Sequence, residues 1–232
     1  MVTVVQPVAA RPKSGMHRTL RSAMILLCLV GAAAAVRRMV ALSAPAVNSR
    51  APALQDLDAR FAIKAGLTYV HITAGLLFVG LVPLQLVSSL RDRMPRRHRI
   101  VGRVLLAVGS VAIAFPMVLR NPVSGVNEAG ATIFIASLFL FSLGKAFWFI
   151  RHRNAALHRE FMIRAVAIAL GIAPTRPIMG AFFATASLTH LTPQQFFGTA
   201  FWLGFSINYV FAEAGLSCTR VEIHQTLTGA SR

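Results

Sequence analysis

The stretch from Arg91 to Arg103 constrains the fold of this chain more than any other. It carries six arginines, one histidine and a single acid, and it joins two long apolar segments. Soluble proteins rarely place so much charge between such segments. Membrane proteins often do, because short loops rich in Arg and Lys stay on the cytoplasmic side. We therefore predict a multi-pass membrane protein whose orientation is set by this basic hairpin.

Composition supports the same class and excludes others. Hydrophobic residues make up 56% of the chain and charged residues 13%, whereas soluble domains carry about 25% charged residues. The formal net charge of +17 does not predict nucleic-acid binding, because the basic residues cluster where apolar segments end. That placement predicts orientation in a bilayer and attraction to anionic lipid headgroups. Cys28 and Cys218 indicate neither a disulfide framework nor a cysteine-based metal site.

The apolar segments predict an all-α polytopic membrane bundle of about six transmembrane helices, with both termini in the cytoplasm. A span needs about 20 residues, and the predicted spans are about Ala23–Leu42, Phe61–Leu90, Ile100–Leu119, Ala129–Ile150, Phe161–Ala184 and Gln195–Ser217. The segments predicted to lie inside hold 16 Lys or Arg, and those predicted to lie outside hold six. Residues 1–19 are predicted to form a flexible basic tail, residues 20–217 the bundle, and residues 218–232 a short cytoplasmic tail.

The first apolar segment has two interpretations. It runs from Ala23 to Val36 before Arg37 and Arg38 interrupt it, a length that also suits the apolar region of a signal peptide. Alternatively it is a retained span that continues to about Leu42, with the two arginines snorkelling outward. We favour the retained span, and the topology of the other helices is the same in either case.

His71 and Arg176 are candidate site residues because ionisable groups within a span are costly. Both are expected at a similar depth from the outer side. His71 is a candidate haem or metal ligand or proton-relay group, or else a neutral histidine hydrogen-bonded between helices. Arg176 stands between Pro174 and Pro177. It could bind an anionic headgroup, a haem propionate or a quinone oxygen, or be satisfied by carbonyls that the prolines free.

Two His-Arg pairs begin the third and fifth predicted spans, and another arginine follows each pair. At the start of a helix, unbonded amides and the helix dipole favour anions. If the two starts are adjacent, their arginines would gather in one cytoplasmic pocket that binds phosphate, a lipid headgroup or a carboxylate. Alternatively, the arginines are ordinary loop charges that only set the orientation of the protein in the membrane. Glu160 and Glu213 are the expected local partners of these arginines and of Lys145. The residues of the two starts are His98, Arg99, Arg103, His158, Arg159 and Arg164.

The usual catalytic motifs do not occur in the sequence. It has no Gly-rich phosphate loop, no Cys-x-x-Cys and no His-Glu-x-x-His, and it has few acids. Whether the protein is an enzyme is therefore left open. Imidazole is the one abundant ligand type, which indicates haem before zinc.

Several motifs together resemble a family of predicted bacterial membrane proteins catalogued as domain of unknown function 2306. The resemblance covers about residues 67–180. It implies a helical membrane architecture and no established reaction, and the family's histidines on a small bundle look like those of two-haem cytochrome b-type proteins. The motifs are His71 with Gly75, Gly80–Gln85, Leu90–Arg93, Pro95 with His98-Arg99 and Gly102-Arg103, His158–Arg164, and Arg176.

These observations lead to two functional hypotheses for a multi-pass protein of the bacterial inner membrane. The first is b-type haem binding or electron transfer toward a quinone, with His71, His98 and His158 as candidate iron ligands. Arg99, Arg103, Arg164 and Arg176 would then hold propionates or other anions. The second is a non-enzymatic lipid- or anion-binding protein, or an accessory subunit of a membrane complex, that uses the arginines alone. A transporter comes third, because no internal repeat of three spans is evident.

Overall fold

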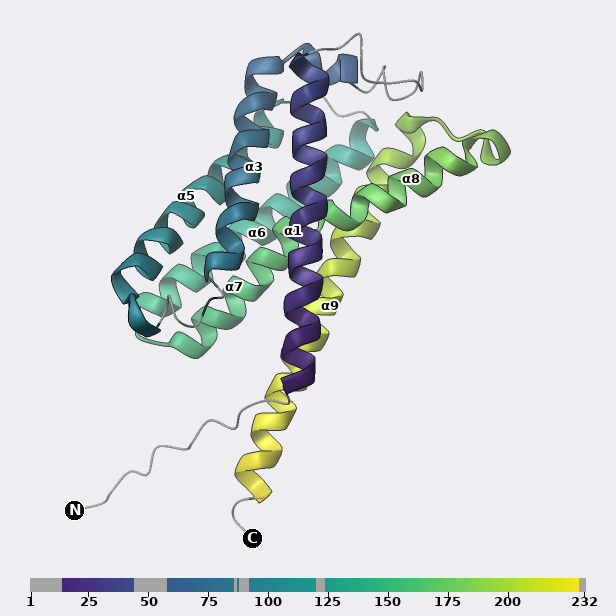
Figure 1. Cartoon of the computed structure of the whole chain (residues 1–232). Helices are drawn as coiled ribbons and strands as arrows, with labels where there is room; N and C mark the ends of the chain where they lie inside the picture. Colours follow the sequence, from purple (N-terminus) through teal and green to yellow (C-terminus); the bar gives the residue numbers. More distant parts are fainter. Residues whose placement is uncertain (1–13, 44–57, 86, 88–91, 120–123, 230–232) are drawn as a thin grey trace, which may run out of the picture.

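A computed structural model describes residues 14–43, 58–85, 87, 92–119 and 124–229. These residues are almost entirely helical and contain no strand, which confirms the all-α prediction. Figure 1 shows long helices packed side by side, with α1 crossing the face of the bundle. The helices are α1 (Ser14–Ser43), α3 (Ala65–Gln85), α5 (Pro95–Leu119), α6 (Gly125–Arg151), α7 (Ala155–Leu170), α8 (Ile172–Thr189) and α9 (Pro193–Gly229).

Four stretches of the described chain are long and apolar enough to cross a membrane: Arg21–Ser43, Ala65–Gln85, Gly125–Arg151 and Ala155–Thr189. They correspond to the first, second, fourth and fifth predicted spans. Helices α5 and α9 occupy the other two predicted spans, so the total of six spans stays a prediction. Helices are expected because backbone amides in lipid must be hydrogen-bonded within the chain.

Two helices extend beyond the predicted spans. Helix α1 begins at Ser14, within the segment predicted to be a tail, and α9 continues to Gly229, past the predicted end of the bundle at residue 217. Once a helix exists, each added residue gains a hydrogen bond at little entropic cost. The first 13 residues, the proline-containing linker at 44–57, Arg91 and the turn at 120–122 lie outside the described residues.

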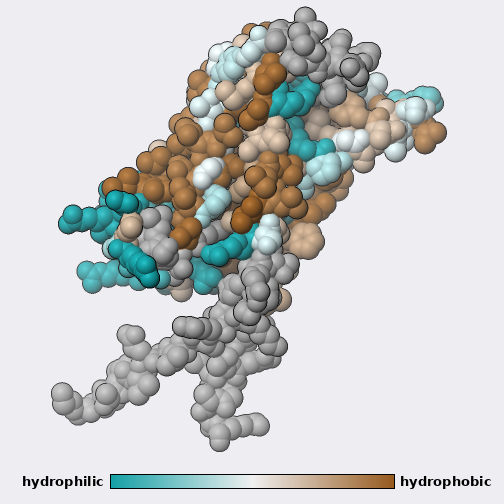
Figure 2. All heavy atoms as spheres, viewed as in Figure 1, coloured by the Kyte–Doolittle hydropathy of each residue, from teal (hydrophilic) through white to brown (hydrophobic). Residues whose placement is uncertain are grey.

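The core lies where α3, α5, α6 and α7 meet. Phe78 of α3 packs edge-on against Phe139 of α6, with ring centroids 6.1 Å apart, and Leu105, Ile168 and Leu170 complete the contact. Many large apolar side chains remain exposed on the outside, including Leu26, Leu77 and Phe134. Figure 2 shows a broad hydrophobic face with hydrophilic residues at the end where α5 begins and α6 ends. Such a surface suits contact with lipid chains.

Helices α7 and α8 form one long apolar segment that is interrupted at Gly171. The Gly171 amide donates to the Ile168 carbonyl at 3.0 Å, and the Thr175 hydroxyl donates to the Gly171 carbonyl at 2.9 Å. Pro177 lies inside α8 and supplies no amide to the helix. The interruption lets α8 leave the bundle toward α1 and α9, and it positions Arg176 against α1.

Candidate functional site

Arg37 and Arg38 of α1 meet a single carboxylate, that of Asp58, in a short helical segment at residues 58–62. Arg37 Nη2 lies 3.0 Å from Asp58 Oδ2, and Arg38 Nη1 bonds Asp58 Oδ1. Asp58 is only 8% exposed. The Arg38 guanidinium also lies over the Phe61 ring, 4.3 Å from its centroid, which partly offsets the cost of removing that charge from water.

Arg176 of α8 joins this group as a third guanidinium. Arg37 and Arg38 both act on it electrostatically, and no carboxylate of the described residues does. Its Nε is buried and has no hydrogen-bond partner in the described part of the chain. The carbonyls that Pro174 and Pro177 free were one expected partner, but they do not satisfy this nitrogen. An unpaired buried donor on a cation is costly, so Arg176 is the least compensated group of the site.

His71 of α3 lies within the electrostatic reach of Arg176, as expected for two residues at a similar depth. Its Nδ1 is 2.7 Å from the carbonyl oxygen of Ala112 on α5. A carbonyl oxygen only accepts, so Nδ1 carries the proton and Nε2 is left as an acceptor. His71 therefore ties α3 to α5, as its structural interpretation predicted, while its second nitrogen stays available for a ligand.

We call these residues the arginine cluster: Arg37, Arg38, Arg176, Asp58 and the neighbouring His71. Among the residues that the structure describes, the three guanidiniums and one carboxylate of the cluster leave two positive charges in excess. Charges removed from water are tolerated when they are paired. The arrangement can therefore hold an anion, and Arg offers the forked donors that match carboxylate and phosphate oxygens.

Arg164, one of the arginines of the predicted cytoplasmic pocket, is already paired with acidic side chains. Arg164 is satisfied by Glu213 of α9, with Nε 2.5 Å from Oε1 and Nη2 3.0 Å from Oε2, and it lies 3.6 Å from Glu160. Arg220 pairs with Glu160, which raises the pKa of the Arg220 guanidinium. The expectation that Glu160 and Glu213 would pair with nearby arginines is confirmed.

The two His-Arg helix starts have separate surroundings. The Gln85 side chain at the end of α3 donates to the His98 carbonyl at 3.1 Å, whereas the His158 ring donates to the Ala146 carbonyl of α6, with Nδ1 2.9 Å from the oxygen. Each start is thus held by the helix that precedes it in the chain. The other arginines of the starts are exposed, namely Arg99, Arg103 and Arg159.

His71 and His98 are too far apart to bind one haem iron together. His71 lies near the beginning of α3, and His98 contacts Gln85 at its end. The intervening part of α3 spans about 20 Å at 1.5 Å per residue. In the described ranges, no group of three His, Cys, Asp or Glu side chains could hold a metal ion.

Sequence reasoning missed Arg37, Arg38 and Asp58 as site residues. The sequence predicts that the two arginines snorkel outward, but the Arg38 side chain is only 12% exposed and both arginines pair with Asp58. That pairing depends on tertiary packing, which residue types alone do not reveal. The usable signal was the adjacent pair itself, because two arginines that interrupt an apolar run need a counter-charge.

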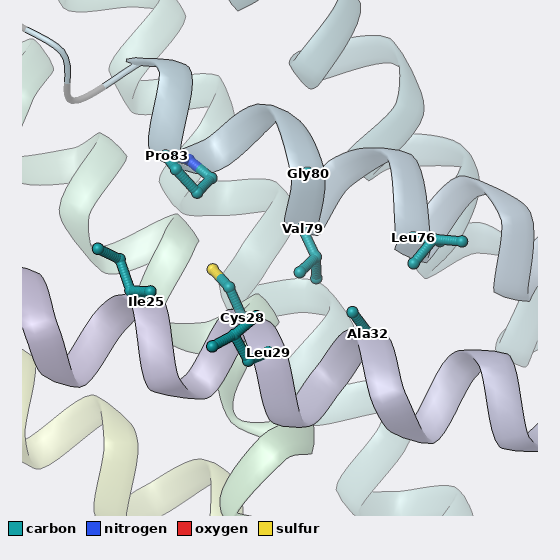
Figure 3. Close-up of a pocket in the computed structure, with 8 residues that line it drawn as sticks. All are labelled: Ile25, Cys28, Leu29, Ala32, Leu76, Val79, Gly80 and Pro83. Atoms are coloured by element: carbon teal, nitrogen blue, oxygen red, sulfur yellow. The ribbon is translucent and has the colours of Figure 1, made fainter.

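A cavity of about 220 Å³ between α1 and α3 is separate from this cluster. Figure 3 shows the Cys28 sulfur directed from α1 toward α3 and no charged group in the lining. The cavity therefore suits apolar chains and not an anion. Its lining residues are Ile25, Cys28, Leu29, Ala32, Leu76, Val79, Gly80 and Pro83.

A family model described as predicted membrane protein (DUF2306) matches residues 68–215. The match includes His71, Arg164 and Arg176 and leaves Arg37 and Arg38 outside it. No curated protein and no solved structure matches the chain.

Proposed function

We propose that this chain, which belongs to the DUF2306 family of predicted membrane proteins, is an integral membrane protein that binds an anion at the arginine cluster. One observation carries the proposal: Arg37 and Arg38 share one carboxylate, and the Nε of Arg176, which lies within electrostatic reach of both arginines, is buried without a partner in the described chain. The anion would supply the missing negative charge and accept from Arg176. Haem propionate, a lipid headgroup and a soluble oxyanion all offer that chemistry.

Access to the cluster comes through Arg37. Its side chain is 43% exposed, whereas those of Arg38 and Asp58 are 12% and 10% exposed. Figure 2 shows hydrophilic atoms interrupting the hydrophobic face where the upper part of α1 lies. A ligand can therefore contact the cluster first at Arg37.

Replacing Arg176 with glutamine tests the proposal. Sulfate is expected to raise the melting temperature of the detergent-purified wild-type protein, relative to chloride at equal ionic strength, because a ligand that binds only the folded state stabilises it. Arg176→Gln should weaken sulfate binding about ten-fold or more, as expected for loss of a buried charge-assisted contact. Without sulfate the variant should be at least as stable as wild type, because an uncompensated charge is gone.

Arg159→Gln is the matched control, because it removes one exposed arginine from the other end of the bundle. It should keep the full effect of sulfate. Equal stabilisation by sulfate in Arg176→Gln and wild type would show that the anion binds elsewhere.

Haem b bound through one histidine is the second candidate. The hydrogen bond from His71 Nδ1 to the Ala112 carbonyl is the kind of contact that orients a metal-binding histidine with Nε2 toward the metal. Arg176 would then face a propionate. Electron transfer toward a quinone, or a role as an accessory subunit, would rest on that same cofactor.

An absorbance spectrum separates the two candidates. The haem hypothesis predicts a Soret band in protein purified from cells supplied with haem, and His71→Ala should weaken that band while sulfate binding persists. His152→Ala is the control, since this exposed ring is bonded to its own helix. A spectrum without a Soret band would leave anion binding as the sole candidate.

A further inference from the structure

We infer that the anion of the arginine cluster is doubly charged, a tetrahedral oxyanion of the phosphomonoester class. This inference rests on the proposed function and names the ligand class for the same site. It follows from the number of charges in the described cluster, the donors that Asp58 leaves unused, and the hydrogen bond of His71 to a carbonyl.

The excess positive charge of the arginine cluster is balanced best by an anion with two negative charges. Arg37 and Arg38 share one carboxylate, and Arg176 lies within electrostatic reach of both arginines, while the ring of His71 uses its Nδ1–H to bond a carbonyl. A monoanion would leave one positive charge uncompensated among largely buried groups. Coulomb energies are several-fold larger at the low effective dielectric of such a site than in water. A dianion balances the excess.

The donors of the cluster favour a tetrahedral ligand over a planar one. Asp58 already accepts from both terminal nitrogens of Arg37, at 3.4 and 3.0 Å, and from one nitrogen of Arg38. Arg176 approaches from another helix, and its Nε remains unpaired in the described structure. A guanidinium has five N–H donors, so several directions stay unsatisfied. A phosphate group presents three terminal oxygens in three directions, whereas a carboxylate presents two in one plane.

Two sources could supply this chemistry: inorganic phosphate from solution, or the headgroup of a lipid phosphomonoester from the bilayer. Both carry a terminal phosphate with a second pKa near neutrality, about 6 for a phosphomonoester. Arg37 stands at the surface of a helix with exposed apolar neighbours such as Val36 and Val40. Either source can therefore reach the cluster.

The first experiment compares sulfate with methanesulfonate, two tetrahedral probes of similar size that differ by one charge. Each is titrated against the detergent-purified full chain by isothermal calorimetry at constant ionic strength. Sulfate should bind about ten-fold more tightly or better, the scale expected for one extra unit charge in a partly buried site. Equal affinities would overturn the dianion inference. Failure of both probes to bind would overturn the proposed function itself.

Variants of the cluster sharpen this comparison. Arg37→Gln lowers the excess to one positive charge and should bring the two affinities close together, while Asp58→Asn raises the excess and should widen the preference for sulfate. Arg37 is chosen because its side chain is the most exposed of the Arg37–Asp58–Arg38 group. A sulfate preference that is unchanged in both variants would also overturn the inference, because the preference would then not depend on the cluster's charge.

A pH series tests the phosphate class. Inorganic phosphate gains its second charge as the pH rises through neutrality, whereas sulfate remains a dianion throughout. The affinity of phosphate relative to sulfate should therefore rise several-fold between about pH 5.5 and 8. Any change in the charge of the protein itself acts on both probes and therefore cancels in the ratio of their affinities. A ratio that stays constant would overturn the phosphomonoester class.

The last arm distinguishes the two sources. The protein is reconstituted in nanodiscs of phosphatidylcholine with either phosphatidic acid, a phosphomonoester, or phosphatidylglycerol, a phosphodiester monoanion, and bound lipid is measured by native mass spectrometry. Retention of phosphatidic acid that Arg176→Gln abolishes supports a lipid source. Binding of inorganic phosphate by a protein that retains neither lipid supports a soluble source. Preferential, cluster-dependent retention of phosphatidylglycerol would contradict the dianion inference.

Discussion

Gly204→Ala should destabilise the protein by about 3 kcal/mol, the upper part of the range for an overpacked core. A Cβ at Gly204 would lie 2.8 Å from the backbone nitrogen and 2.9 Å from the Cα of Thr175, and it would overlap the Thr175 hydroxyl oxygen. Thr175 is fully buried, and its hydroxyl is bonded to the Gly171 carbonyl next to the α7–α8 interruption. Backbone cannot move aside as a flexible side chain can, so α8 and α9 would have to separate.

Thermal unfolding in detergent measures this effect, with Gly144→Ala as the matched control. Gly144 is also helical, but nothing lies within 4 Å of the site of its added Cβ. The control should be neutral or stabilising by up to about 1 kcal/mol, the difference in helix propensity between alanine and glycine. A Gly204→Ala protein as stable as the control would mean that α8 and α9 do not pack as described.

The second large effect is expected for Arg164→Lys, which should destabilise the protein although the positive charge is kept. Arg164 makes two hydrogen bonds to Glu213 and is 13% exposed in its side chain. Lysine cannot make the forked contact. The loss should be about 1–3 kcal/mol, the scale for hydrogen bonds to charged groups, and toward the lower end because Glu213 is 33% exposed. Arg103→Lys should have no effect, because Arg103 is exposed.

A double-mutant cycle identifies the cause of this loss. Glu213→Gln should cost about as much as Arg164→Lys, and the double variant should cost clearly less than the sum of the two, since both changes break the same contact. Additive losses would show that Arg164 stabilises the protein through other contacts. If Arg103→Lys and Arg164→Lys changed the stability equally, the role of both arginines would be to set the orientation of the protein in the membrane.

The fold could be predicted from the sequence because a lipid bilayer permits few backbone structures. Apolar runs of about 20 residues must be helical in a bilayer, and their positions depend only on composition along the chain. The interruption at Gly171 was not predicted, because Pro174 and Pro177 indicate a distortion without locating it. The ends of α1 and α9 were missed for a different reason: helices continue into polar sequence where no residue stops them.

The site was harder to predict because the charge of a residue and its depth in the membrane do not specify which residues it contacts. The helix starts at His98 and His158 are similar in sequence, yet they are held by different helices through Gln85 and Ala146. Conversely, the arginines at the end of the first span proved more important than their exposed position implied. The proximity of His71 and Arg176 was predictable, because both were counted from the same end of the bundle.

Arg164 and Arg176 lie on the same long apolar segment, which has a consequence for the electric field across the membrane. Twelve residues separate them, at most about 18 Å at 1.5 Å per residue because the helix is interrupted at Gly171, while the hydrocarbon core of a bilayer is about 30 Å thick. Polar groups gathered around each arginine bring the high-dielectric region inward from both sides. A resting potential then falls mainly over the apolar turns between them, so the field there is stronger than in the surrounding lipid. A ligand charge held at Arg176 lies at the edge of that drop and contributes little to any voltage dependence.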